Sequence, residues 1–258
     1  MATIIQPFSK FINECAVNLK QRNLTGIAIT SANKLLLLCG SDPSRVDIYS
    51  DCRTYEDNIE LTSPPWGITV VPGTNKAVVT LPGEKSIQFI NINNTNDSNK
   101  IEIGEKIEIG DEGYGVTAVK DSIYIGGKDK VIILNAVGSR EGEIQVGGLI
   151  ISDLLYNEEK DQLLLRKEGR LCCIKLNGND IYEYIISGHR GLAVDKQGRV
   201  YVSGNVSHEI HRLSPDGNLD VVLSNDVHEP RDMTFNNDFT TLFVIKQRGD
   251  ALTGYGCE

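Results

Sequence analysis

The chain has 258 residues, of which 40% are hydrophobic and 24% charged, and its formal net charge is −9. This composition excludes a disordered chain, and the acidic balance disfavours non-specific attraction to nucleic-acid phosphates. The apolar runs are short and the N-terminus has no signal-peptide pattern, which excludes a transmembrane helix and predicts a cytoplasmic protein.

Six cysteines are scattered along the chain without a CxxC spacing. This pattern favours reduced thiols over a zinc site or a disulfide framework, and we expect no cofactor or metal. The cysteines are Cys15, Cys39, Cys52, Cys172, Cys173 and Cys257.

Short apolar stretches closed by Gly, Pro, Asn or Asp predict an all-β chain. The phrase PPWGITVVPGTNKAVVT at 64–80 returns as EPRDMTFNNDFTTLFV at 229–244, and four further copies lie at similar intervals. A period of about 41 residues holding four strands is typical of propeller blades, so we predict a six-bladed β-propeller. The six anchor positions are Gly26, Gly67, Gly115, Ser152, Gly191 and Asp232.

Each repeat divides into strands A to D, of which A lies next to the central channel. In the fifth repeat these are GLAVD, RVYVSG, EIHRLS and DVVLS, joined by tight turns. The anchor glycine opens strand A, where a side chain would crowd the neighbouring blade.

The two ends of the chain supply a prediction about ring closure. The sixth repeat has TTLFVIK as strand B and ALTGYG as strand C, but it has no strand D, whereas an extra strand at about 14–19 precedes the first repeat. We predict that this strand completes the sixth blade and places Cys15 beside Thr253, so that residues 1–258 form one closed propeller without the sheet edges that an open array would expose.

The segment between the second and third repeats is longer than the others. Its polar start at 91–100 predicts an exposed loop, and the near-duplicate KIEIG at 100–104 and 106–110 allows two registers for one D strand. A functional insert within 91–112 and a slack surface loop both remain open.

The D-to-A and B-to-C loops share one face of a propeller, around the channel mouth. Just before the anchors stand Thr25, Trp66, Tyr114, Ile151, Arg190 and Arg231, which should ring this mouth.

The charges on this face nearly balance, so the acid excess falls on the strands and the opposite face, as at 54–58 and 157–161. The tryptophan, tyrosine and arginines have the composition of a binding hot spot, although the same side chains could pack between blades. The candidate binding residues are Trp66, Tyr114, His189, Arg190, Arg231, Lys246 and Arg248.

The fifth repeat, GLAVDKQGRVYVSGNVSHEIHRLSPDG, resembles an NHL repeat. The second repeat resembles the propeller at the C-terminus of invertebrate tripartite-motif (TRIM-like) proteins, and the similarity extends over about 11–256. The fourth repeat departs from it, with Ser152 and Asp153 where glycine is usual. The resemblance implies a six-bladed propeller that recognises a protein substrate or RNA, and we expect it here without the RING, B-box and coiled-coil segments that carry ligase activity.

A catalytic alternative is a lactonase-like metal-dependent hydrolase, which needs several oxygen ligands in the channel. The sequence offers only Asp153 and Asp232 there, its four histidines have no ligand spacing, and no G-x-S-x-G motif occurs. We therefore expect a non-catalytic interaction module with a protein ligand ahead of RNA, and no membrane partner; the oligomeric state stays open.

Overall fold

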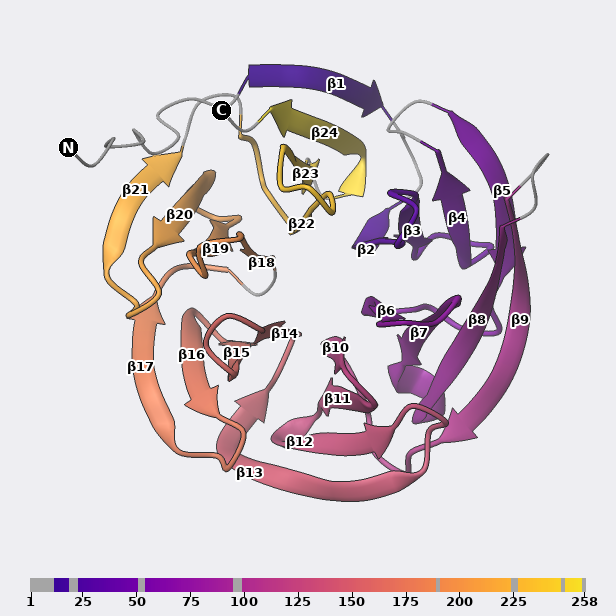
Figure 1. The fold of residues 1–258 in the computed structure, drawn as a ribbon, viewed down its shortest axis with the longest axis horizontal. Coiled ribbons are helices and arrows are strands. Elements are labelled where there is room, and N and C mark those ends of the chain that lie inside the picture. Colours follow the sequence, from indigo (N-terminus) through magenta and orange to yellow (C-terminus); the bar gives the residue numbers. More distant parts are fainter. Residues whose placement is uncertain are drawn as a thin grey trace.

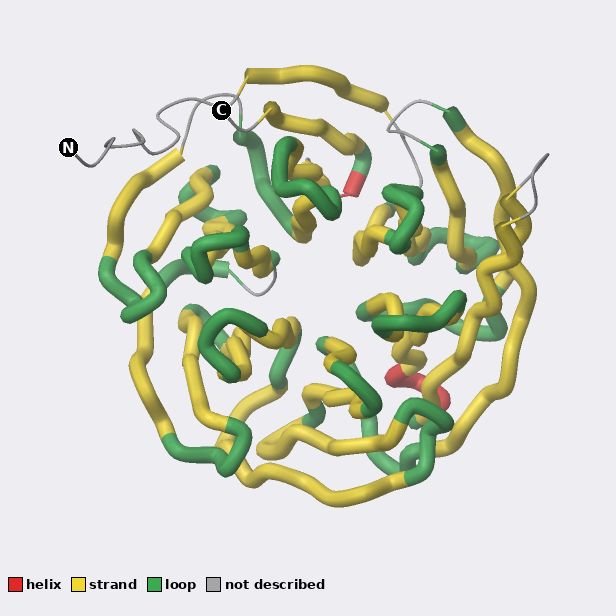
Figure 2. Tube along the Cα trace, in the orientation of Figure 1, coloured by secondary structure: helices red, strands yellow, loops and turns green. Residues whose placement is uncertain are grey.

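The computed structural model describes residues 12–18, 23–50, 54–94, 99–188, 191–223, 227–246 and 249–256. Within them, six four-stranded antiparallel sheets stand around a central channel as the blades of a ring (Figure 1). Nearly all regular structure is strand, and loops and turns join the strands (Figure 2). The predicted six-bladed β-propeller is confirmed. No helix among the described residues is long and apolar enough to cross a membrane.

In the first five blades, the strands follow one another from the channel outwards. The first three blades are β2 (Leu24–Ile29), β3 (Leu35–Cys39), β4 (Arg45–Tyr49), β5 (Tyr55–Glu60); β6 (Ile68–Val71), β7 (Lys76–Leu81), β8 (Ser86–Asn94), β9 (Asn99–Glu108); and β10 (Val116–Val119), β11 (Ser122–Gly126), β12 (Lys128–Asn135), β13 (Arg140–Ile150). The next two are β14 (Asp153–Asn157), β15 (Gln162–Lys167), β16 (Arg170–Lys175), β17 (Asp180–Ile185); and β18 (Leu192–Val194), β19 (Val200–Gly204), β20 (Glu209–Leu213), β21 (Leu219–Leu223). The sixth combines β22 (Asp232–Phe235), β23 (Thr241–Lys246) and β24 (Ala251–Gly256) with β1 (Ile12–Asn18).

The core lies between the blades, because each sheet packs both of its faces against neighbours. Strand β3 shows how the sequence encodes this arrangement. Leu36 and Leu38 pack toward the second blade, whereas Leu35 and Leu37 pack toward the sixth. All four are 0% exposed. A strand that is covered on both faces reads as an unbroken apolar run.

Ring closure by the N-terminal strand is confirmed. Strand β1 pairs antiparallel with β24 at the outer edge of the sixth blade, so the two ends of the chain complete one sheet (Figure 1). Thr253 faces Ala16 rather than Cys15, which faces Gly254. The predicted neighbour was thus one residue off, as the register shifts at a bulge between Asn13 and Cys15.

The expected exposed loop at 91–100 was wrong for most of its length. Strand β8 continues to Asn94 and β9 begins at Asn99, so the two form a long hairpin whose tip lies outside the described residues. Ile92 and Ile101 pair across the hairpin and are both buried. Their apolar alternation outweighs the polar residues between them, and both KIEIG copies lie in or directly beside the same strand.

The fourth blade is aligned one residue differently from the sequence prediction. The Trp66 amide donates to the carbonyl of Thr80, and the Ser152 amide donates equivalently to that of Arg166. Asp153, not Ser152, is therefore the structural counterpart of Gly67. The error arose because no glycine marks the anchor in this repeat.

Candidate binding site around the central channel

The corrected alignment also changes the ring of residues at the channel mouth. Ser152 takes the place that was predicted for Ile151, which is 0% exposed and packs in the core. Thr25, Trp66 and Ser152 line the central cavity at this end. Three blades thus bring residues that lie in or just before their inner strands to one mouth.

Trp66 extends across the mouth instead of standing free. Its indole Nε1 donates to the carbonyl of Ser152 over 2.8 Å, which links the second blade to the fourth. The Trp66 and Tyr114 rings form a T-shaped pair with a centroid distance of 5.1 Å, and the Tyr114 hydroxyl donates to Glu112 over 2.7 Å. Burial, followed by the hydrogen bond with Glu112, raises the pKa of Tyr114 to about 12. The pair is half-buried and held in one geometry.

Arg231 occupies the equivalent position in the sixth blade. Its Nη1 donates to Oδ1 of Asn23 in the first blade over 2.8 Å. Burial lowers the pKa of the guanidinium, while the neighbouring Asp232 raises it. Arg231 therefore both joins two blades and presents a partly exposed cation at the mouth.

The remaining candidates divide into two groups. Lys246 is 6% exposed, and its Nζ donates to the hydroxyl of Tyr255 over 2.9 Å, so it contributes to the interior of the sixth blade rather than to an open rim. His189, Arg190 and Arg248 lie outside the described residues.

The anchor glycines permit the close approach of neighbouring blades, as predicted. A Cβ atom on Gly67 would lie 2.7 Å from the Tyr114 carbonyl oxygen, and one on Gly191 would lie 2.8 Å from that of Arg231. In both cases the obstructing backbone belongs to the next blade. These contacts leave no room for a side chain.

Aspartate replaces glycine at the anchors of the fourth and sixth blades. Oδ2 of Asp153 accepts the Gly191 amide over 3.0 Å, and Oδ2 of Asp232 accepts the Ile27 amide over 3.0 Å. Each carboxylate therefore bonds the inner strand of its own blade to that of the next. Both side chains also line the channel.

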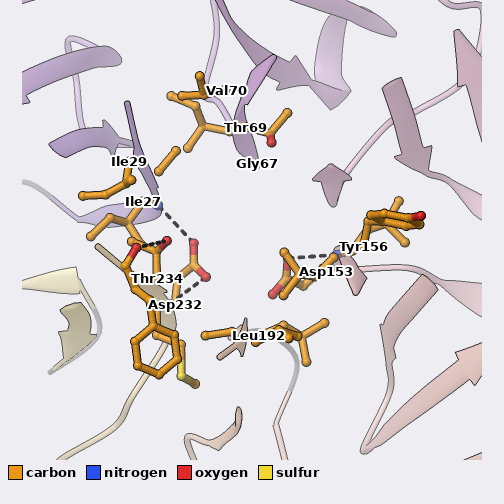
Figure 3. A pocket seen from close by; sticks show the side chains of 18 of the residues that line it. Ile27, Ile29, Gly67, Thr69, Val70, Asp153, Tyr156, Leu192, Asp232 and Thr234 are labelled. Atoms are coloured by element: carbon orange, nitrogen blue, oxygen red, sulfur yellow. Dashed lines mark hydrogen bonds between the residues drawn. The ribbon is translucent and has the colours of Figure 1, made fainter. Parts of the chain in front are cut away.

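The central cavity has a volume of about 580 Å³ and runs along the inner strands. Figure 3 shows its wall, in which apolar side chains such as Ile27, Val70 and Leu192 and the carboxylates of Asp153 and Asp232 line the same cavity. Toward the A-to-B loops, further lining residues are Tyr156, Asn157, Glu158, Glu159, Asp195 and Lys196. The sequence had placed acid excess at 157–161 but had not connected it to the channel.

The described histidines lie away from this cavity. Nδ1 of His211 bonds Tyr184 over 2.7 Å and its Nε2 bonds Glu209 over 3.0 Å. Nδ1 of His208 accepts the Glu229 amide, and its ring lies against that of His228. Across the part of the chain that the structure describes, no group of three or more His, Cys, Asp or Glu side chains is placed to hold a metal ion.

Comparison with solved structures supports the fold. The chain is similar to the β-propeller domain of Cps50 (Swd1) from Myceliophthora thermophila, with a TM-score of 0.66 and 14% identity over 90% of this chain and 83% of that one. It is also similar to a streptogramin B lyase, with a TM-score of 0.66 and 12% identity over 97% and 100% of the two chains. BamB from Moraxella catarrhalis gives a TM-score of 0.60 and 12% identity over 95% and 99%. No protein-family model and no curated protein sequence matches the chain.

At these identities the comparisons establish a β-propeller and nothing about chemistry, because propellers support unrelated activities. The similar proteins include a lyase and two proteins that are not named as enzymes. The propeller fold is compatible with a general role as an interaction module.

Proposed function

We propose that this chain is a non-catalytic interaction module of the NHL or TRIM-like type, which binds a protein partner in the cytoplasm. The binding surface is the channel mouth that carries Trp66, Tyr114 and Arg231. One observation carries the proposal: a half-buried tryptophan is fixed across the mouth by its bond to Ser152 and its T-shaped contact with Tyr114.

Fixed aromatic and arginine side chains suit protein recognition for an energetic reason. Tryptophan, tyrosine and arginine are enriched in hot spots, and a side chain that is already ordered costs less entropy on binding. Arg231 is also held, by Asn23, and its planar guanidinium suits a partner carboxylate. The same contacts stabilise the packing of the blades, so one set of bonds serves both purposes.

RNA is the alternative ligand, and the charge balance places it second. Phosphate neutralisation supplies most non-specific affinity for RNA, and a chain of net charge −9 offers little of it. The Trp66 and Tyr114 rings could still stack on bases, so the test below includes RNA.

The test compares wild type with Arg231→Glu in quantitative affinity capture from cell extract, followed by binding measurements with the purified partner. We expect Arg231→Glu to weaken binding at least tenfold. Lys175→Glu is the matched control, because this exposed lysine lies toward the C-to-D loops on the opposite face. Thermal unfolding of all three proteins checks that each is folded.

Two results would contradict the proposal. If Arg231→Glu and Lys175→Glu weakened partner binding equally, binding would depend on the overall charge of the protein rather than on the channel mouth. Saturable binding to a pool of short RNAs, steeply salt-dependent and lost in Arg231→Glu, would replace the protein partner with RNA.

A further inference from the structure

The central cavity, which opens beside Trp66 at the channel mouth, has the properties of a small-molecule site. Its volume of about 580 Å³ lies within the usual range for ligand pockets, about 300–1,000 Å³. Much of its wall is apolar, including Ile27, Ile29, Leu155 and Phe235. These side chains suit a ligand with a hydrocarbon or aromatic body.

The charged groups on this wall are mostly acceptors. Five carboxylate residues line the cavity, namely Asp153, Glu158, Glu159, Asp195 and Asp232, against one ammonium, that of Lys196. None of the three nearby arginines is a lining residue: Arg199 pairs with Asp195 over 2.6 Å, Arg166 is fully buried beside Asp153, and Arg231 stands at the mouth next to Asp232. Glu158 and Glu159 are exposed, so their carboxylates are open to a ligand, whereas Asp153 and Asp232 also accept backbone amides.

Asn157 provides an independent sign of a missing donor. It lines the cavity and is 1% exposed. Its Nδ2 donates to the carbonyl of Gly198 over 3.2 Å, whereas its Oδ1 has no hydrogen-bond partner among the described residues. A buried acceptor without a donor costs about 1–3 kcal/mol, and a ligand N–H group would remove this cost.

The acceptors are spread along the channel rather than gathered at one point. Asp153 opens β14 and Asn157 ends it, with Glu158 and Glu159 in the following turn. At about 3.3 Å per residue, this strand separates the two ends by roughly 13 Å. An ammonium group can therefore bind at one end while its apolar body lies between them.

We propose that the central cavity binds an organic cation, in which a primary ammonium group is carried on an apolar body. The ammonium pairs with the wall carboxylates, and the body packs against the inner-strand aliphatic and aromatic side chains. The cation can come from a free amine or from a lysine side chain of a peptide. This site does not depend on the proposed protein partner.

The test titrates the whole chain with 2-phenylethylamine and with 2-phenylethanol, a neutral analogue of similar shape. Trp66 is the single tryptophan and lines the cavity, so its fluorescence reports occupancy, with calorimetry as a second readout. We expect the amine to bind at least tenfold more tightly than the alcohol. A capped Gly-Lys-Gly peptide in a parallel titration distinguishes a side-chain ammonium from a free amine.

Variants then locate the bound cation. Asp153→Asn and Asp232→Asn keep an oxygen for the backbone amide but remove the charge, and Glu158→Gln/Glu159→Gln alters only exposed positions. We expect at least one of these proteins to bind the amine fivefold or more weakly. Glu141→Gln, an exposed acid on β13, makes the same chemical change away from the cavity and should have no effect.

The proposal is overturned if the alcohol binds as tightly as the amine. It is equally overturned if all the cavity variants retain wild-type affinity for the amine, or if neither the amine nor the peptide binds.

Discussion

At the scale of single residues, the inner end of each blade is governed by how closely two backbones approach. Gly191 has φ +90°, and a Cβ there would lie 2.3 Å from Oγ of Ser203 as well as against the sixth blade. Asp153 and Asp232 solve the same problem differently, by bonding the next blade through a carboxylate. The anchor position therefore requires either no side chain or one that bonds across the gap.

Gly191→Ala should destabilise the protein by about 2–4 kcal/mol, because it adds steric overlap to a backbone conformation that alanine rarely adopts. Urea unfolding followed by circular dichroism measures the change. Gly83→Ala is the matched control, since nothing lies within 4 Å of the added atom and φ is not positive. If Gly191→Ala lowered the free energy of unfolding by less than about 0.5 kcal/mol, the steric account would be contradicted.

Trp66→Phe should lower the free energy of unfolding by about 0.5–1.5 kcal/mol, because it removes the Nε1 donor to Ser152 while an aromatic ring remains against Tyr114. Chemical denaturation gives the stability. Trp66→Ala, which also removes the ring, should cost clearly more. Equal stabilities of the two variants would show that the ring contact contributes nothing.

At the scale of elements, ion pairs join the outer strands to their loops. Asp111, in the loop before β10, bonds Lys130 on β12 over 3.0 Å and lies 3.5 Å from Arg140 on β13. The hydrogen bond from Lys130 holds the pKa of Asp111 below its ordinary value of 3.8. Because the folded pKa is lowered, the stabilisation is present above pH 3.8 and is lost as the pH falls through the folded value.

Asp111→Asn should therefore be less stable than wild type at neutral pH, and this difference should shrink as the pH falls below about 4. The effect is small, since the pair is partly exposed. Urea midpoints measured across this pH range provide the test. Asp121→Asn, an exposed aspartate in the turn between β10 and β11, serves as the control. A difference that persists undiminished in acid would rule out the ion pair as its cause.

The strands also show which parts of the fold could be predicted from the sequence and which could not. Alternating or unbroken apolar runs, as in β3 and β19, predicted strands directly, because burial on both faces leaves a clear pattern. The β8–β9 hairpin was missed because Asn and Asp dominate its tip and conceal Ile92 and Ile101. The shift to Asp153 had no signal in the repeat, since hydrogen-bond pairing alone fixes that register.

At the scale of the whole molecule, closure of the ring joins the two ends of the chain in one blade. Strand β1 covers the outer edge of β24, which would otherwise present unpaired backbone groups. Neighbouring blades share their cores, so opening one junction exposes apolar surface on both sides.

Removal of residues 1–18 should therefore lower the thermal unfolding temperature by several degrees and promote association through the exposed edge. Calorimetry and size-exclusion chromatography measure the two effects. A truncation of residues 1–10 retains β1 and serves as the matched control. An unchanged unfolding temperature without β1 would mean that closure contributes little to stability.

The sequence by itself determined the six repeats, their strand order and the closing strand, because these follow from the local periodicity of apolar residues and from turn residues. It also identified Trp66, Tyr114 and Arg231 as neighbours of the channel mouth. Only the tertiary structure decided that Trp66 bonds Ser152 two blades away, that Lys246 is internal, and that Asp153, Asp232 and Glu158 line one cavity. Those relations depend on distances between separate blades, and repeat periodicity does not encode such distances.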